Sequence, residues 1–456
     1  MVFNSGIFLF VFLPVVFALF WLARTKRQRY VLLTLSGYVF YGYWDWRFCL
    51  LLLFSSLVAF WVGLELEKPA SLARRRAWMI ASVGVNLAIL GFFKYYNFFA
   101  ESVAGLFPAA GLPVLKVVLP IGISFYTFHT ITYIVDVMVG RVRATRDLFE
   151  FLAYVSLFSQ LVAGPIVRFR QIEDDLEAID GPPREDWLAV GVGRFVIGMA
   201  KKVLVADQLA GLIDPMIGSY ATLSLAGAWF AAAGYTFQLY YDFSGYSDMA
   251  VWLGLMFGLR IPENFRSPYQ ALNPRDFWRR WHISLSTCLR DYLYIPLGGN
   301  RGGRWRTLAN LMVTMLLGGL WHGASWTFVV WGGYHGLLLV LDHVTSRAME
   351  KVAAPLRRAI TFLLVMLGWV LFRSSSFGMA LVWLRKLVGL DAGVQDPSLA
   401  LVFGVAACLV AVNVLPASAD LRVPTGRRWA WVYASALFIC CLFIHGGERV
   451  FLYYQF

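Results

Sequence analysis

Charged residues are scarce in this sequence, and long hydrophobic runs take their place. Asp, Glu, Lys and Arg make up 15% of the 456 residues, whereas 59% are hydrophobic and 17% are aromatic. A soluble chain cannot bury that much apolar surface, which excludes an ordinary soluble domain. Within lipid, helices satisfy their own backbone hydrogen bonds. The composition therefore predicts an all-α polytopic membrane protein.

Cysteine is rare and is poorly placed for cross-linking or metal binding. The five cysteines lie in apolar or amphipathic stretches without a disulfide framework or zinc-ligand spacing (Cys49, Cys288, Cys408, Cys440 and Cys441). Neither a disulfide scaffold nor a metal site is predicted. The Gly-x-Ser-x-Gly elbow, the Walker loop, the HExxH motif and the Rossmann fingerprint are missing as well. The chemistry of this chain therefore has to rest on other groups.

Apolar runs of spanning length recur along the whole chain. A spanning helix needs about 20 apolar residues, so we expect roughly 11–13 membrane-embedded helices, some of them re-entrant or interfacial. Pro165 is expected to break one of these helices. The long runs lie at residues 7–23, 77–99, 114–135, 147–166, 223–241, 325–341, 359–372, 398–416 and 429–446, and the shorter or more polar runs at 31–44, 48–64, 187–205, 243–259 and 307–321.

Basic residues set the expected orientation of the chain. The first apolar run is followed by a basic cluster at residues 24–29 and has no basic residue before it. This order predicts an anchor with its N-terminus outside and not a cleaved signal. The basic groups at 74–76 and 141–146 then fall on the same, cytoplasmic side.

The positive charge is concentrated in one segment. The chain carries a net charge of +13, and residues 260–310 hold nine arginines and three carboxylates, a net charge of +6. One interpretation is cytoplasmic placement beside anionic headgroups. The other is a docking face for an anionic small molecule or an acidic carrier protein. Nucleic acid is not expected as a partner, because the charge flanks spanning segments.

Two histidines within residues 264–336 are the main candidates for chemistry. His322 lies in the apolar sequence TMLLGGLWHGASW, where flanking glycines let another backbone or a ligand approach closely. An ionisable residue in such a run is a functional candidate, and a neutral imidazole in a dry site can act as a general base. His282 and Ser286 share a helix face. Cys288 lies on another face, so a Cys–His nucleophile pair is not expected.

Two carboxylates interrupt the apolar sequence QLYYDFSGYSDMA at residues 238–250. Asp242 and Asp248 fall where a span is expected. We interpret them as part of a hydrogen-bonded helix junction rather than as catalytic groups. His129, within another span, is interpreted as a core residue.

The segment FWRRWHISLSTCLRDYLYIPLGGNRGG, the later motif LWHG and the motif YYDFSGYSDMA together resemble the membrane-bound O-acyltransferase (MBOAT) superfamily. Within it, the chain is similar to the bacterial alginate O-acetyltransferase branch, including its opening MVFNSGIFLFVFLPVVF. The resemblance implies helices around a central tunnel and transfer of an acyl group, most often acetyl, from a cytoplasmic thioester toward an extracellular polysaccharide such as alginate. His322 matches the catalytic histidine of the family, and His282 matches its second histidine.

The charge pattern and the resemblance together predict where substrates and partners bind. We expect no bound cofactor and no metal, and the donor is acetyl-CoA or an acyl carrier protein. Arg279, Arg280 and Arg290 are expected to bind this donor. The cavity is expected to be lined by Trp321, Ser286, Asp242 and Asn264. Expected partners are membrane lipid, a periplasmic acetyltransferase of the serine-hydrolase type and a polysaccharide assembly complex, at the bacterial inner membrane.

We expect one multi-pass MBOAT domain over residues 1–456. It divides into N-terminal scaffold helices (1–140), a catalytic core (141–345), and C-terminal helices with an aromatic tail (346–456). The tail, residues 451–456, should emerge outside, because basic residues precede the last span. It resembles a C-terminal aromatic motif in which a tyrosine carries the acyl group. By position this is Tyr453, with Tyr454 as the other candidate.

Two other functions remain open from the sequence. The chain could be a polysaccharide or lipid transporter whose histidines line a permeation path, although no two-fold internal repeat is visible. It could also be a structural subunit of an exopolysaccharide complex, with the basic segment as an assembly surface. Loss of acylation on changing His322 to Ala separates the enzyme from both alternatives.

Overall fold

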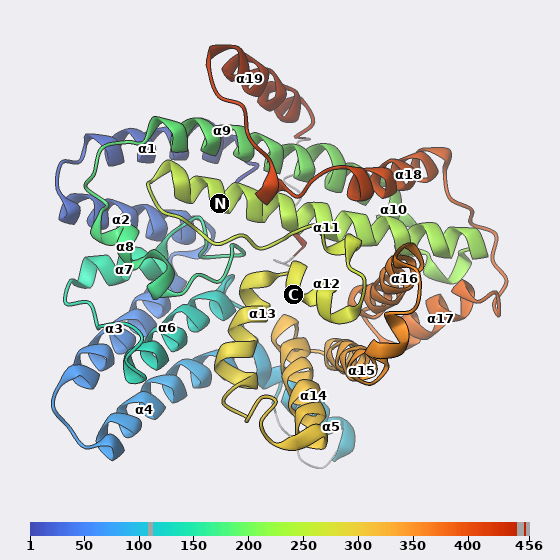
Figure 1. Ribbon diagram of the computed structural model, residues 1–456, viewed down its shortest axis with the longest axis horizontal. Coiled ribbons are helices and arrows are strands. Elements are labelled where there is room, and N and C mark those ends of the chain that lie inside the picture. The colour runs from blue at the N-terminus through green and yellow to red at the C-terminus, as the bar shows by residue number, and fades with distance from the viewer. Residues whose placement is uncertain (108–112, 445–450, 453–456) are drawn as a thin grey trace. The chain divides into compact units, whose positions relative to one another are not determined.

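The computed structural model describes residues 1–107, 113–444 and 451–452 (Figure 1). Regular structure in these residues is helical, apart from an isolated bridge between Leu223 and Gln395. The chain forms two compact units built from segments distant in sequence. Unit 1 comprises residues 1–195, 249–262 and 424–433, and unit 2 comprises residues 196–248, 263–423 and the described part of 434–456.

Unit 1 is built mainly from the first third of the chain. A π-helical turn, Phe8–Phe12, leads into its first helix. The helix α6 packs against both α3 and α4, and α7 packs against α2 and α3. The helices of unit 1 are α1 (Leu13–Leu22), α2 (Lys26–Asp45), α3 (Arg47–Glu67), α4 (Leu72–Leu90), α5 (Tyr96–Leu106), α6 (Ile123–Met138), α7 (Leu148–Ser156), α8 (Phe169–Glu177) and most of α9 (Glu185–Ala200).

Unit 2 holds the two histidines that the sequence singles out. Its helices are α10 (Asp207–Gly218), most of α11 (Leu225–Met256), α12 (Pro274–Arg280), α13 (Ile283–Leu289), α14 (Gly303–His322), α15 (Trp326–Met349), α16 (Ala354–Arg373), α17 (Phe377–Leu387) and α18 (Leu399–Val414). The last helix, α19 (Arg427–Leu442), contains residues of both units. Figure 1 shows α14, α15 and α16 in yellow to orange, and α15 packs against the other two.

Glycines allow α14 and α15 to approach closely. A Cβ atom at Gly319 would lie 2.3 Å from the carbonyl oxygen of Phe328, and one at Gly332 would lie 2.3 Å from that of Met315. Contacts this short exclude any side chain at either position. The glycines around His322 therefore serve helix packing first, and they bring the end of α14 against α15.

Three helical stretches of the described residues are long and apolar enough to cross a membrane. They are Arg47–Glu67, Leu72–Leu106 and Ala354–Arg373. The second combines α4 and α5 through the π-helical turn Gly91–Tyr95. The expected total of roughly 11–13 membrane-embedded helices stays a prediction.

The runs at 223–241 and 243–259 are not two spans. They form the single 32-residue helix α11, which continues through Asp242 and Asp248. The expectation of a helix junction there was wrong, because α11 is continuous. Both carboxylates can lie within the helix since each is paired with a lysine inside unit 2. Lys202 Nζ lies 2.5 Å from Asp242, and Lys201 Nζ lies 2.7 Å from Asp248. A charged side chain whose charge is compensated can remain within a buried helix.

Two other expected spans are shorter than their apolar runs. In the run 147–166, the helix α7 ends at Ser156, well before Pro165, and the residues that follow form buried turns. In the run 114–135, α6 begins only at Ile123, after Gly122 in the left-handed conformation (φ +76°). Non-helical backbone is tolerated at membrane depth where protein buries it. Apolar sequence alone therefore overstates helix length here.

Candidate functional site

His322 lies at the C-terminal end of α14, and its side chain is 5% exposed. Aromatic rings enclose the imidazole: its centroid is 5.0 Å from those of Trp321 and Trp331 and 5.6 Å from that of Phe372. The carbonyl end of a helix favours a nearby positive charge by typically ~0.3–1 kcal/mol. The position therefore suits a histidine that accepts a proton in a water-poor site.

A cavity of about 770 Å³ leads to His322 from a basic opening. Its exposed lining residues are the cationic or titratable Arg275, Arg279, Arg290 and His343, together with Asn300. Its buried lining includes Gly318 on α14, His322 and Trp331. The cavity thus joins an anion-attracting surface to a buried imidazole.

His282 lies beside His322, with 6.3 Å between the two ring centroids. It is fully buried and precedes α13 in the left-handed conformation, at φ 45°. That conformation is uncommon for a residue other than glycine and persists only where the surroundings hold it. The structure therefore brings together the two histidines that are forty positions apart in sequence.

Asn264 holds His282 in place. Its Oδ1 atom lies 3.1 Å from His282 Nδ1 and accepts hydrogen bonds from the backbone N–H and the hydroxyl of Ser284, at 3.2 and 2.9 Å. Its Nδ2 donates to the hydroxyl of Ser247 at 3.1 Å. An amide oxygen only accepts, so Nδ1 of His282 carries the proton in this arrangement. In the neutral ring, Nε2 is then the basic nitrogen.

The three arginines expected at the donor site do not lie together. Arg279 and Arg290 line the cavity, and Arg290 also contacts Asp291 at 2.7 Å. Arg280 instead donates to Asp276 at 2.8 Å and lines a second hollow with Arg266 and Asp420. This hollow holds two ion pairs, Arg266 with Asp420 and Arg280 with Asp276, and the hydrogen bond to Asp420 raises the pKa of Arg266.

The four side chains expected to line a cavity occupy different positions. Ser286 lines the cavity, and its hydroxyl also donates to the carbonyl of Trp281 at 3.3 Å. Trp321 packs on His322, and Asn264 bonds His282, so both support the histidines. Asp242 is buried in an ion pair with Lys202.

The described end of the C-terminal tail lies on this ion pair. Leu452 donates its backbone N–H to Asp242 Oδ2 at 2.9 Å. The ring of Phe451 lies 4.2 Å from that of Tyr246, and Lys202 Nζ lies 4.6 Å from the centre of the Phe451 ring. The two candidate relay residues, Tyr453 and Tyr454, lie outside the described residues.

Sequence reasoning missed three groups that shape this region. Lys202 holds Asp242, while Trp331 and Phe372 pack on His322. A signal for Lys202 was present: Lys201 and Lys202 lie in one apolar run, and two carboxylates lie in another. No such signal marks the two aromatic residues, because aromatics occur throughout the chain.

Potential metal-ligand clusters and the state of the cysteines can be stated for the described part of the chain. Among residues 1–107, 113–444 and 451–452, no group of three or more His, Cys, Asp or Glu side chains could hold a metal ion. All five cysteines are free thiols.

Known proteins supply the class of this enzyme. Residues 140–380 match the family model of the membrane-bound O-acyltransferases (MBOAT). The chain is 46% identical over 387 residues to the probable alginate O-acetylase AlgI of Pseudomonas aeruginosa, covering 83% of this chain and 73% of that protein. This chain belongs to the membrane-bound O-acyltransferase family.

Relatives named for other acceptors also match. The chain is 36% identical over 424 residues to the peptidoglycan O-acetyltransferase of Helicobacter pylori, covering 86% of this chain and 80% of that protein. It is 27% identical over 278 residues to the teichoic acid D-alanyltransferase of Bacillus subtilis, covering 56% of this chain and 69% of that protein. The MBOAT chain described here is thus a polytopic membrane protein and an O-acyltransferase. Of the three functions left open by the sequence, family membership selects the enzyme.

Proposed function

We propose that this MBOAT enzyme moves an acetyl group from a cytoplasmic thioester across the inner membrane, for O-acetylation of an extracellular polysaccharide such as alginate. The observation that carries the proposal is the cavity that joins the exposed Arg275, Arg279 and Arg290 to the buried His322. An anionic donor binds at the basic end, and its acyl group reaches the imidazole.

In the proposed reaction, His322 acts as the general base. The hydroxyl oxygen of the acceptor attacks the thioester carbonyl as its proton passes to the imidazole. The carbon–sulfur bond breaks, and the departing thiolate takes the proton back from the imidazolium, so the products are an ester and a free thiol. General-base help of this kind is typically worth about 10²–10⁴-fold in rate. The thioester is already activated, so the step needs no nucleotide triphosphate.

His282 is a second proposed participant. Asn264 directs the proton of His282 to Nδ1, so that Nε2 is the basic nitrogen of the neutral ring. With 6.3 Å between the ring centroids, both imidazoles can act on groups in one small region. The basic opening suits either donor, acetyl-CoA or an acyl carrier protein, because both are anionic.

Tyr453 is the proposed acyl relay on the acceptor side. Support comes from the tail segment before it, because Leu452 is held by Asp242 within the unit that carries His322. A phenyl ester is more activated than an alkyl ester, so a periplasmic transferase of the serine-hydrolase type can take the acyl group onward to the polymer.

A labelled-acyl assay tests this function. Purified enzyme is given acetyl-CoA or acetylated carrier protein carrying a labelled acetyl group, and the C-terminal peptide is analysed by mass spectrometry. The wild type should form an acyl adduct on that peptide. His322→Gln, which keeps the size of the buried side chain, should lose it, and Tyr453→Phe should move or abolish it.

Cys288→Ala is the matched control, because Cys288 is buried near His282 but has no role in the proposal. It should retain the adduct. An adduct of normal yield in His322→Gln would contradict the role of His322 as general base. Normal polymer acetylation by a Tyr453→Phe, Tyr454→Phe double variant would contradict the acyl relay.

A further inference from the structure

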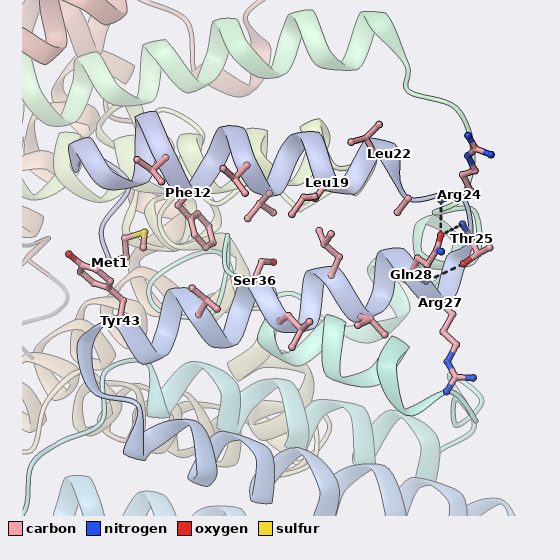
Figure 2. A pocket seen from close by; sticks show the side chains of 18 of the residues that line it. Met1, Phe12, Leu19, Leu22, Arg24, Thr25, Arg27, Gln28, Ser36 and Tyr43 are labelled. Carbon is pink, nitrogen blue, oxygen red and sulfur yellow. Dashed lines mark hydrogen bonds between the residues drawn. The ribbon is translucent and has the colours of Figure 1, made fainter.

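A long apolar groove runs between α1 and α2 in unit 1, far from the histidines in sequence. Its volume is about 1110 Å³. Figure 2 shows side chains of the two helices facing each other across it, with Arg24, Thr25, Arg27 and Gln28 at one end and Tyr43 at the other. The groove therefore has one basic end and an apolar length.

The apolar lining follows helical spacing on both sides. On α1 and the residues before it, the lining includes Ile7, Val11, Val15 and Leu19, each four positions apart. On α2, Leu35, Val39 and Tyr43 repeat the same spacing. Val15 is 52% exposed and Val39 is 59% exposed. Two facing stripes of this kind need an apolar occupant.

The lining favours an acyl chain over a packed protein helix. Helices associate in membranes through small residues that let backbones approach. Here the lining is mainly of branched or large side chains such as Leu19, Leu32 and Leu35, with Ser36 as one of few small ones. A flexible hydrocarbon chain can fill the space between branched side chains, whereas a helix backbone is held away by them.

Two arginines at the basic end have no carboxylate partner among the described residues. Arg24 and Arg27 are exposed, and neither forms an ion pair there. Their neighbours are already engaged: Lys26 lies 4.0 Å from Asp180, and Arg29 donates to the carbonyl of Gly181 at 2.9 Å. Arg27 lies over the ring of Phe149, 5.7 Å from its centroid, a contact that leaves its charge uncompensated, so both arginines can attract an external anion.

The turn that carries these arginines is fixed. Gln28 accepts hydrogen bonds from the backbone N–H groups of Arg24 and Thr25, at 2.9 and 3.2 Å, and Thr25 accepts one from Gln28 N–H at 3.3 Å. This capping box satisfies two of the free donors at the start of α2, the N–H groups of Thr25 and Gln28. The guanidinium groups of Arg24 and Arg27 supply the full positive charges at this end.

We propose that this groove binds an anionic phospholipid, with its acyl chain along α1 and α2 and its phosphate at the end that carries Arg24 and Arg27. The length suits an acyl chain: the lining from Ile7 to Leu22 covers fifteen helical steps, a rise of about 22 Å, which is more than half of the ~30 Å hydrocarbon core. The basic end lies at the headgroup level of the cytoplasmic leaflet, where anionic lipids attract Lys and Arg.

Native mass spectrometry of the full-length enzyme in detergent tests this site. The probes are phosphatidylglycerol and phosphatidylcholine with identical acyl chains, titrated onto delipidated protein. The wild type should bind one phosphatidylglycerol at least about tenfold more tightly than phosphatidylcholine, a difference of about 1.4 kcal/mol. The double variant Arg24→Gln, Arg27→Gln should lose this preference.

A matched control and a groove-filling variant separate headgroup from chain. Arg74→Gln, Arg76→Gln removes two exposed arginines of the same unit and should leave the preference intact. Val15→Trp should block the acyl chain and lower binding of both lipids, whereas glycerol phosphate without acyl chains should not compete.

Three results would overturn the proposal. Equal binding of the two lipids by the wild type would remove the headgroup site. An unchanged preference in the Arg24→Gln, Arg27→Gln variant would place the anion elsewhere. Dimers cross-linked efficiently through Val15→Cys in membranes, with no lipid bound to the groove, would assign it to a second copy of the chain.

Discussion

Two neighbouring arginines, Arg279 and Arg280, differ in what surrounds them. Arg279 lines the cavity that ends at His322, whereas Arg280 is held by Asp276 in a separate hollow. The sequence predicted donor binding for both, because a run of basic residues does not show which side chain faces which surface. The structure makes one of them a test and the other its control.

Arg279→Glu should weaken the donor more than the acceptor. Reversing one charge at the cavity opening should raise the KM for the thioester donor at least about tenfold, or about 1.4 kcal/mol, and the effect should shrink as salt rises. Initial rates measured at several ionic strengths check this result. Arg280→Glu should change the KM by less than about threefold, and equal effects of the two variants would remove Arg279 from the donor site.

At the scale of elements, α11 shows what the sequence could predict and what it could not. Helical apolar character was correctly predicted on both sides of Asp242, but continuity was not, because the compensating Lys202 comes from a segment forty residues away. A hydropathy window reads a carboxylate as a break when its partner lies outside the window. The sequence also did not predict that α7 ends at Ser156. The residues that follow are apolar because they are buried, although they form turns and not a helix.

Removing Lys202 should destabilise unit 2 strongly. Lys202→Met leaves Asp242 buried without its cation, which typically costs about 3–5 kcal/mol. Thermal unfolding in detergent measures this loss. The double variant Lys202→Met, Asp242→Asn should recover part of the stability. Lys68→Met removes an exposed ion pair with Glu65 and should cost less than about 1 kcal/mol. Similar losses for Lys68 and Lys202 would contradict the account of α11.

The contact between α14 and α15 should tolerate no side chain at Gly319. Gly319→Ala places a Cβ 2.3 Å from the Phe328 carbonyl, so the helices must separate and His322 must move from Trp331. We expect a loss of about 1–3 kcal/mol in stability together with lower acyl transfer. Gly84→Ala, with open space around its Cβ, is the control and should be neutral or stabilising. A fully active, stable Gly319→Ala enzyme would show that the close approach is not needed.

At the scale of the whole molecule, the histidine pair was predictable because its signals are local. His322 stands out as an ionisable group among glycines and apolar residues, and His282 stands out in a basic aromatic segment. Their closeness was not derivable from composition, because it depends on Asn264 and on the approach of α14 and α15. The cavity likewise depends on tertiary structure, because residues of α12, α13, α14 and α15 line it.

Sidedness is the property that the proposed function requires of the whole enzyme. The basic end of the cavity should face the cytoplasm under the positive-inside rule. The donor is membrane-impermeant, so its access to one face can be controlled. Right-side-out and inside-out membrane vesicles from cells that make the polymer present opposite faces to an added donor.

The central measurement is incorporation of labelled acetyl into polymer from donor added outside these two kinds of vesicle. Inside-out vesicles, which expose the cytoplasmic face, should acetylate polymer enclosed within them, right-side-out vesicles should not, and His322→Gln should abolish the signal of the inside-out vesicles. Equal incorporation by the two kinds of vesicle, or full incorporation with His322→Gln, would contradict acyl transfer across the membrane through His322.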